Sequence, residues 1–141
     1  YNIWVEGTYV IVENLDVQTS IVLRPKTDLG GEGHHISLRR LEIHDIDGHA
    51  VLLGWPHGGD NHPEYLDPAL IHHAVIYNSV MHDIGPDWQA GPEADYMGVF
   101  VGINSDTTWI LDNEMHYIDG DCIHLNCHGI ENPTIVQSPP I

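Results

Sequence analysis

Aspartate and histidine side chains recur at the same place in a repeated sequence segment. Asp47, Asp95 and Asp119 occupy equivalent positions, and Asp121 and His124 follow the last of them. Carboxylates stacked about 5 Å apart repel one another, so they require a cation, a shared proton or full solvation. Asp-Gly is also favourable turn chemistry in its own right, and a fold that repeats would repeat it without any ligand.

Two functions are open to these residues. A hard cation such as Ca²⁺ prefers oxygen ligands, and its predicted ligands are Asp47, Asp95 and Asp119. Alternatively, one carboxyl group keeps its proton while a neighbour stays ionised, as in general acid–base catalysis. The catalytic candidates are then Asp95, Asp119, Asp121 and His124, with His124 beside Asp121 as a candidate base.

Histidine is unusually frequent, with 12 residues against 4 Lys and Arg together. His44, His82 and His116 recur in one frame and form either a stacked ladder on the surface or, with nearby carboxylates, a transition-metal site. The pairs His34-His35 and His72-His73 precede predicted strands. Because successive side chains of a strand point to opposite faces, neither pair is expected to chelate a metal by itself.

The segments that position these residues repeat along most of the chain. Equivalent positions lie 26, 38 and 34 residues apart, and each copy contains three short stretches with the period of two that is typical of strands. Short strands recurring in the same order predict a solenoid, in which equivalent residues stack around one core. The turn-rich insertions at 54–68 and 86–94 are expected to be loops. A β-sandwich, the competing architecture, predicts longer strands in hairpins.

The stacking predicts the core without further information. The inward columns are expected to be Val51/Val99/Ile123, Leu53/Val101/Leu125 and Ile43/Met81/Met115. A column of Val22, Leu52, Phe100 and His124 is expected on the outer face of the third strand, where it would be covered by loops or by a ligand.

The repeats resemble those of the pectate-lyase-like superfamily of right-handed parallel β-helices. The resemblance rests on residues 34–45, on Trp109-Ile-Leu-Asp-Asn-Glu-Met-His116 and on Gly120-Asp-Cys-Ile123, and it covers about residues 3–128. It implies an all-β, right-handed, single-stranded parallel β-helix of about four coils, with domain boundaries at 1–130 and an irregular tail at 131–141. Members of the superfamily usually have more coils, so the chain is expected to be a fragment of a longer helix.

The resemblance also implies a carbohydrate-active protein that acts as a polysaccharide lyase or glycoside hydrolase. Phe100 and Trp88 are then candidates for stacking on sugar rings, and Arg24 is a candidate substrate-binding residue. Asp121 matches only one of the paired aspartates of polygalacturonase-type hydrolases, and Met97 stands where their further acid would fall. A non-catalytic adhesin or structural module, stabilised by Ca²⁺, is the alternative function.

Composition limits the range of partners. The formal charge is −17, from 21 Asp and Glu against 4 Lys and Arg, and 42% of the residues are hydrophobic. Too few cations are present to neutralise the phosphates of nucleic acid or to dock on an anionic bilayer. No apolar stretch approaches the ~18 residues of a spanning helix, so no membrane insertion is expected. The expected location is extracellular or at the cell surface, although no leader is visible.

Overall fold

The computed structural model describes residues 2–24, 32–54, 71–85, 95–102 and 105–125, and its regular elements there are all β-strands. Sheet A contains β1 (Ile3–Glu6), β4 (Ile21–Arg24), β7 (Val51–Leu53), β10 (Val99–Val101) and β13 (Ile123–Leu125). Sheet B contains β2 (Ile11–Glu13), β5 (Gly33–Arg39), β8 (Ile71–Tyr77) and β11 (Ser105–Leu111). Sheet C contains β3 (Asp16–Val17), β6 (Glu42–Ile46), β9 (Val80–Ile84) and β12 (Glu114–Ile118).

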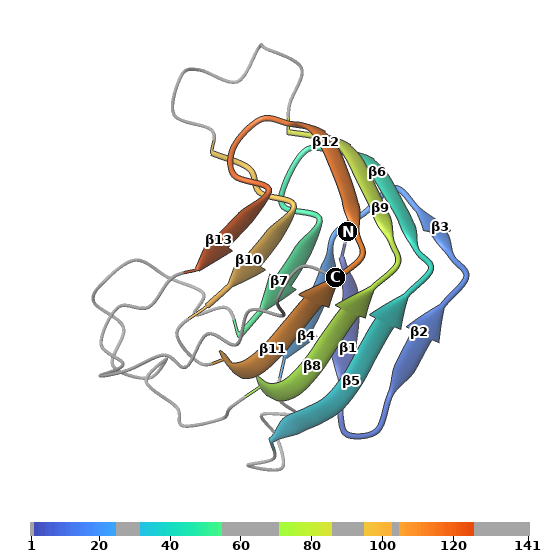
Figure 1. Ribbon diagram of the computed structural model, residues 1–141, viewed down its shortest axis with the longest axis vertical. Coiled ribbons are helices and arrows are strands. Elements are labelled where there is room, and N and C mark those ends of the chain that lie inside the picture. Colours follow the sequence, from blue (N-terminus) through green and yellow to red (C-terminus); the bar gives the residue numbers. More distant parts are fainter. Residues whose placement is uncertain (1, 25–31, 55–70, 86–94, 103–104, 126–141) are drawn as a thin grey trace.

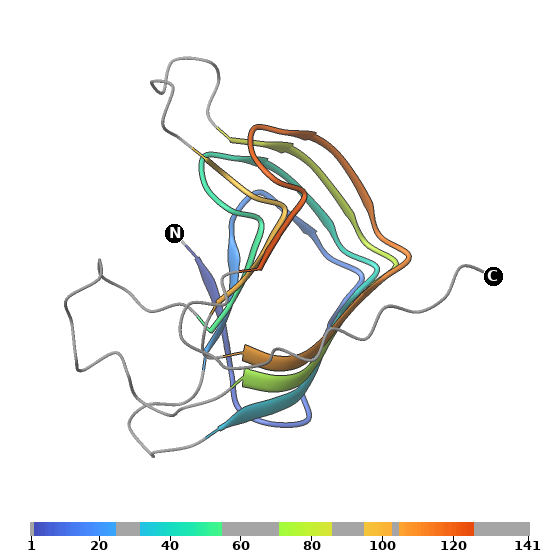
Figure 2. The ribbon, with the colours of Figure 1, turned by 60° about the vertical axis from the view of Figure 1, so that its left-hand side comes forward.

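The chain visits sheets B, C and A in turn and then begins the next coil. Four such coils follow β1, and every paired strand lies parallel to the equivalent strand of a neighbouring coil. Figures 1 and 2 show the three sheets as the sides of one stack around a shared interior. The predicted all-β parallel β-helix is therefore confirmed, and the hairpins of a sandwich are not found among the described strands.

The register confirms the predicted columns. Val51 pairs with Val99, and Val99 pairs with Ile123, while Ile43, Met81 and Met115 stack in the same way in sheet C. A column of like side chains lets each coil bury the apolar face of its neighbour, which a single coil cannot do alone.

Burial is deepest in the middle coils. Leu38, Ile43 and Ile76 are among the fully buried side chains of one hydrophobic core. At the last coil, Ile123 and Leu125 lie in the inward columns, yet they are 45% and 44% exposed. The inward side chains of sheet A therefore become more exposed to solvent at β13.

The strands of sheets B and C after the first coil are longer than predicted, and each contains one left-handed residue. The strands β5, β8 and β11 each have seven residues, where the sequence predicted very short strands. Positive φ angles recur in three columns. These columns are Tyr9/His35/His73/Thr107, with Tyr9 just before β2 and the others within strands of sheet B, Asn14/Arg40/Asn78/Asp112 at the corner between sheets B and C, and Asp45/Asp83/Tyr117 within sheet C.

Each left-handed residue inside a strand interrupts the alternation of side chains. In β5 the buried residues are Gly33, Ile36 and Leu38, and the two residues between Gly33 and Ile36 both face outwards. A strand therefore presents two consecutive side chains on its outer face, which a strict period of two does not allow.

Some segments predicted from the sequence lie outside the residues that the structure describes. The tail at 131–141 and nearly all of both predicted loops lie outside the described residues. Within the described part of the chain, no helix has the length and apolar character needed to cross a membrane.

Candidate functional site

The outer face of sheet A carries the column that the sequence placed there. Trp4 pairs with Val22, and Val22, Leu52, Phe100 and His124 follow in consecutive strands. Val22 and Leu52 are buried, whereas Phe100 and His124 are partly exposed. Trp4, at the other end of the column, is 41% exposed, so aromatic and imidazole groups occupy the accessible ends of this face.

His124 is held between a carboxylate and an aromatic ring. Its Nδ1 lies 3.0 Å from Oδ2 of Asp121, three residues earlier. The rings of His124 and Phe100 stack with centroids 5.4 Å apart and planes 5° from parallel. A neutral imidazole that donates its Nδ1–H to a carboxylate presents the lone pair of Nε2, so this arrangement can serve as a base.

His49 flanks Phe100 on the side opposite His124. The backbone N–H of Met97 donates to Nδ1 of His49 at 3.2 Å, and the ring centroid of Phe100 lies 5.7 Å from that of His49. Burial lowers the pKa of His49, the nearby Asp95 opposes this effect, and His124 adds to it. His49 is therefore held neutral with Nε2–H as a donor, so its role differs from that of His124.

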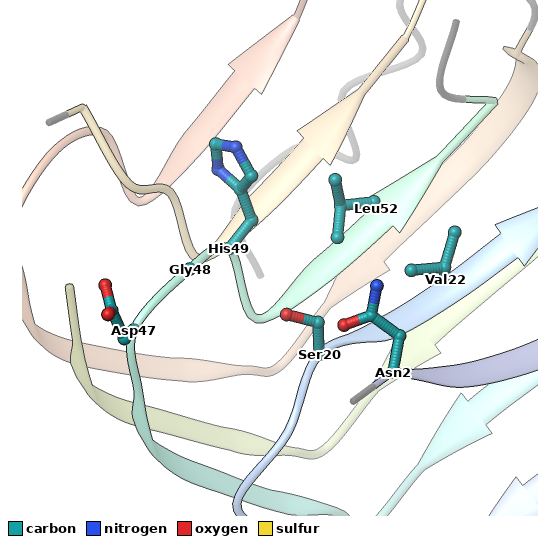
Figure 3. Close-up of a pocket in the computed structure, with 7 residues that line it drawn as sticks. All are labelled: Asn2, Ser20, Val22, Asp47, Gly48, His49 and Leu52. Atoms are coloured by element: carbon teal, nitrogen blue, oxygen red, sulfur yellow. The ribbon is translucent and has the colours of Figure 1, made fainter. Parts of the chain in front are cut away.

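A pocket continues from His49 towards the N-terminal strands (Figure 3). Its volume is about 200 Å³. The lining residues are Asn2, Ser20, Val22, Asp47, Gly48, His49 and Leu52. Drug-sized ligands usually occupy ~300–1,000 Å³, so this pocket suits a smaller group, such as one unit of a polymer.

The three equivalent aspartates have different surroundings. Asp47 accepts a hydrogen bond from Tyr96; desolvation raises the pKa of Tyr96, and the Asp47 carboxylate raises it further. A Cβ at Gly120 would overlap the carboxylate of Asp95, so the absence of a side chain at Gly120 lets Asp95 lie against the neighbouring coil. Asp119 lies against Gly85 in the same way.

The aspartate column bears on the predicted Ca²⁺ site. Among the described residues, no group of three or more His, Cys, Asp or Glu side chains is arranged to hold a metal ion. The Ca²⁺ site therefore stays a prediction.

The predicted substrate-binding residues lie apart. Arg24 forms an ion pair with Glu6, and its guanidinium lies 3.8 Å from the ring centroid of Trp4. Arg24 lies at the end of β4, and β7 separates that strand from β10, which carries Phe100. Trp88 lies outside the described residues.

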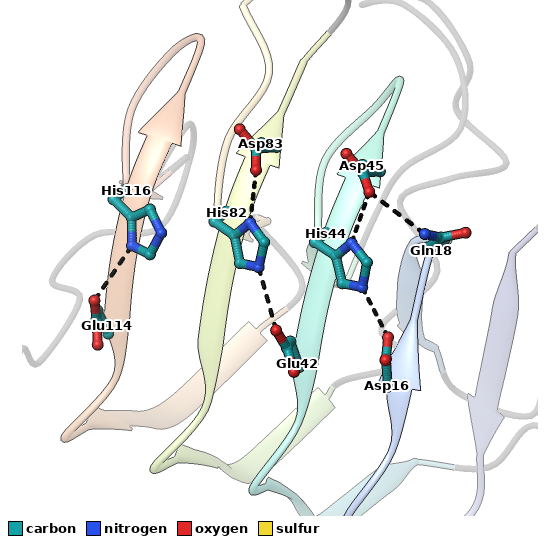
Figure 4. A network of polar contacts seen from close by, with 9 residues as sticks. All are labelled: Asp16, Gln18, Glu42, His44, Asp45, His82, Asp83, Glu114 and His116. Carbon is teal, nitrogen blue, oxygen red and sulfur yellow. Dashed lines mark hydrogen bonds and ion pairs between the residues drawn. The ribbon is translucent and has the colours of Figure 1, made fainter.

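The histidine column forms a ladder on sheet C (Figure 4). His44, His82 and His116 stack with centroids 5.0 and 5.1 Å apart. Nε2 of His44 lies 2.8 Å from Oδ1 of Asp16, and its Nδ1 lies 2.8 Å from Oδ2 of Asp45. Each ring nitrogen of His44 therefore lies within hydrogen-bond distance of a carboxylate. The three rings form the stacked ladder that the sequence predicted as one of two alternatives.

The vicinal histidines are arranged differently from the prediction. His35 and His73 have φ of 54°, so each lies on the same outer face as the histidine before it. The two Nδ1 atoms are 2.8 Å apart in His34-His35 and 2.6 Å apart in His72-His73. The expectation that the two side chains of each pair point to opposite faces is therefore wrong, because a left-handed residue interrupts the alternation.

His49 is the residue of the sheet A site that the sequence analysis left out. The signal was present, because His49 stands two residues after Asp47, as Asp121 does after Asp119. Only the fold shows that the ring of His49 meets Phe100.

The sequence matches no protein-family model, and comparison with curated proteins and with solved structures gives no match. The chain is a parallel β-helix by its structure alone. Its function is therefore argued from the site.

Proposed function

We propose that this protein binds and hydrolyses a polysaccharide of uncharged sugars along the outer face of sheet A. The observation that carries the proposal is the contact of His124 with Asp121 beside the stacked ring of Phe100. This arrangement combines a base, the carboxylate that orients it and an aromatic surface on which a sugar ring can stack. The resemblance of the repeats to the pectate-lyase-like superfamily supports a polysaccharide substrate, and the charge of the sugars is argued from the site.

The charge distribution favours an uncharged polymer over a polyuronate. Asp47 lines the pocket, Asp95 lies near His49, and Asp121 contacts His124. These carboxylates would repel a substrate that carries carboxylates. Each of the three described arginines is in an ion pair: Arg24 with Glu6, and Arg39 and Arg40 with Glu13. Hydrolysis therefore fits these residues better than a lyase reaction, which needs a cation to neutralise the uronate carboxylate.

The proposed chemistry divides between two groups. Nε2 of His124 takes a proton from a water molecule as that water attacks the anomeric carbon. A carboxyl group of the aspartate column, Asp95 or Asp119, protonates the leaving oxygen as its bond to that carbon breaks. Asp121 is a positioning residue, because it acts through the ring of His124.

A panel of neutral and uronic polysaccharides tests the proposal. We expect new reducing ends without unsaturated ends, and a loss of about 10²–10⁴-fold in kcat for His124→Gln. Asp121→Asn should lower kcat with little change in KM, because it alters the base rather than the sugar contacts. His116→Gln is the matched control, since it removes a histidine of the same coil on another sheet.

Three results would contradict the proposal. Unsaturated ends would identify a lyase. Binding to a polysaccharide without cleavage by the wild-type chain would identify a non-catalytic adhesin. Hydrolysis that His124→Gln leaves unchanged would place the chemistry elsewhere.

A further inference from the structure

We propose that His72 and His73 form a two-nitrogen chelate for a late first-row divalent cation, with Cu²⁺ bound most tightly. The site lies on the outer face of sheet B, so it is independent of the proposed polysaccharide site on sheet A. Its basis is the positive φ of His73, which places both rings on one face.

The two ring nitrogens already face one another. Nδ1 of His72 and Nδ1 of His73 are 2.6 Å apart, a distance at which one of them must carry a hydrogen between two lone pairs. A cation can take the place of that hydrogen if His73 moves its proton to Nε2. Both imidazoles then remain neutral, which is the form that binds metals.

Glu32 completes the arrangement on the far side of His72. Its Oε2 lies 3.2 Å from Nε2 of His72. An imidazole that binds a metal commonly donates its second N–H to a carboxylate, which fixes the tautomer and makes the ligating nitrogen more basic. Glu32 therefore prepares Nδ1 of His72, the nitrogen that faces His73, to be the ligand.

The neighbouring coil repeats the pair, but it cannot share the same ion. His34 stacks on His72 at 4.9 Å, and His35 stacks on His73 at 5.0 Å with planes 2° from parallel. A lone pair of imidazole lies in the plane of its ring, so two stacked rings cannot both direct one towards a single ion. This explains why a pair, rather than a group of three or more described side chains, is the unit of binding.

The ligand type selects the metal. Imidazole suits Cu, Ni and Zn, whereas Ca²⁺ and Mg²⁺ prefer oxygen, and affinity in this series is greatest for Cu²⁺. Water molecules would complete the coordination of an ion held by two nitrogens on an exposed face.

Cu²⁺ titration of the intact chain, with glycine as a weak competing ligand, tests the site. We expect hyperfine coupling to two ring nitrogens in the electron paramagnetic resonance spectrum of bound Cu²⁺. The ring centroids of Trp109 and His73 are 5.9 Å apart, so bound Cu²⁺ should also quench the fluorescence of Trp109. Trp109→Phe should remove that component of the quenching.

Variants separate this pair from the other histidines. His73→Gln should abolish the two-nitrogen signal, and Glu32→Gln should weaken binding by about tenfold, at the low end of the effect of an outer carboxylate. His82→Gln is the control, since His82 is an outward histidine of the same coil whose Nδ1 contacts the Asp83 carboxylate instead of an imidazole nitrogen. The double variant His34→Gln/His35→Gln should retain the signal. Circular dichroism of each variant checks that the β-helix is intact.

The proposal is overturned if a folded His73→Gln variant keeps both the nitrogen coupling and the quenching of Trp109. It is also overturned if the signal disappears in the His34→Gln/His35→Gln variant, because the other pair would then be the site. Absence of Cu²⁺ binding by the wild-type chain in competition with glycine would overturn it as well.

Discussion

His44 and His82 lie face to face on sheet C, with ring centroids 5.0 Å apart and ring planes 3° from parallel. Stacked imidazolium rings would repel each other, so neighbouring charges decide whether the ladder can be protonated. Hydrogen bonds to Asp45 and then to Asp16 raise the pKa of His44. For His82 the hydrogen bond to Asp83 raises the pKa most, against desolvation and the charge of His44.

The ladder predicts a stability that depends on pH. A raised pKa in the folded state stabilises the fold fully below the unfolded value of about 6.5, and this contribution is lost as pH rises through the folded pKa. His44→Gln should therefore lower the free energy of unfolding more at about pH 5.5 than at about pH 8. Urea unfolding of both chains at the two pH values measures this, and equal losses would contradict the prediction.

His49 predicts the opposite dependence. Because burial lowers the pKa of His49 in the folded state, its contribution is present above about pH 6.5 and is lost as pH falls from there towards the folded pKa. His49→Gln should therefore make the free energy of unfolding less sensitive to acid. NMR titration of the imidazole signals provides a direct check, with His49 expected below 6.5 and His44 above it. The reverse order would disprove the assignment.

Met81 and Met115 test the gradient of burial along the stack. They are paired positions of β9 and β12, but Met81 is fully buried and Met115 only partly so. Met81→Ala should lower the free energy of unfolding by about 2–5 kcal/mol, and Met115→Ala by clearly less, because less apolar area is lost. Chemical denaturation compares the two, and equal losses would mean that the last coil is as well covered as the middle ones.

Thr107 predicts a stabilising substitution. Its φ is 47°, a conformation that is costly for a β-branched residue and is tolerated better by Asn. Thr107→Asn should raise the free energy of unfolding by about 1 kcal/mol. Asp106→Asn, at the preceding exposed position without a positive φ, should change it little. A destabilised Thr107→Asn variant would show that contacts of the threonine side chain outweigh backbone strain.

Much of the fold could be predicted because the repeats give both the strands and their partners. Aligning the sequence repeats puts Val51, Val99 and Ile123 at equivalent positions, which predicts that they stack in sheet A. The strand register confirms this stacking. The same alignment placed Phe100 beside His124 on the outer face of that sheet. In a solenoid, equivalent residues of successive coils are neighbours in space, so the alignment of the repeats predicts contacts directly.

The candidate site was less predictable, because its residues come from different positions of the repeat. His49 stands just before β7, Phe100 lies within β10, and the ring contact between them depends on how each corner turns. Similarly, the sequence predicts that Arg24 binds a substrate, whereas the fold places Glu6 and Trp4 against its guanidinium.

The sequence by itself determined the coils, the columns and the apolar interior, because a period of two repeated in one order leaves few other ways to bury those side chains. Only the tertiary structure decided which consecutive residues share a face. A single left-handed residue such as His73 or Asp45 turns two neighbouring side chains outwards, and no glycine marks the place. That backbone choice brings His72 to His73 and His44 to Asp45.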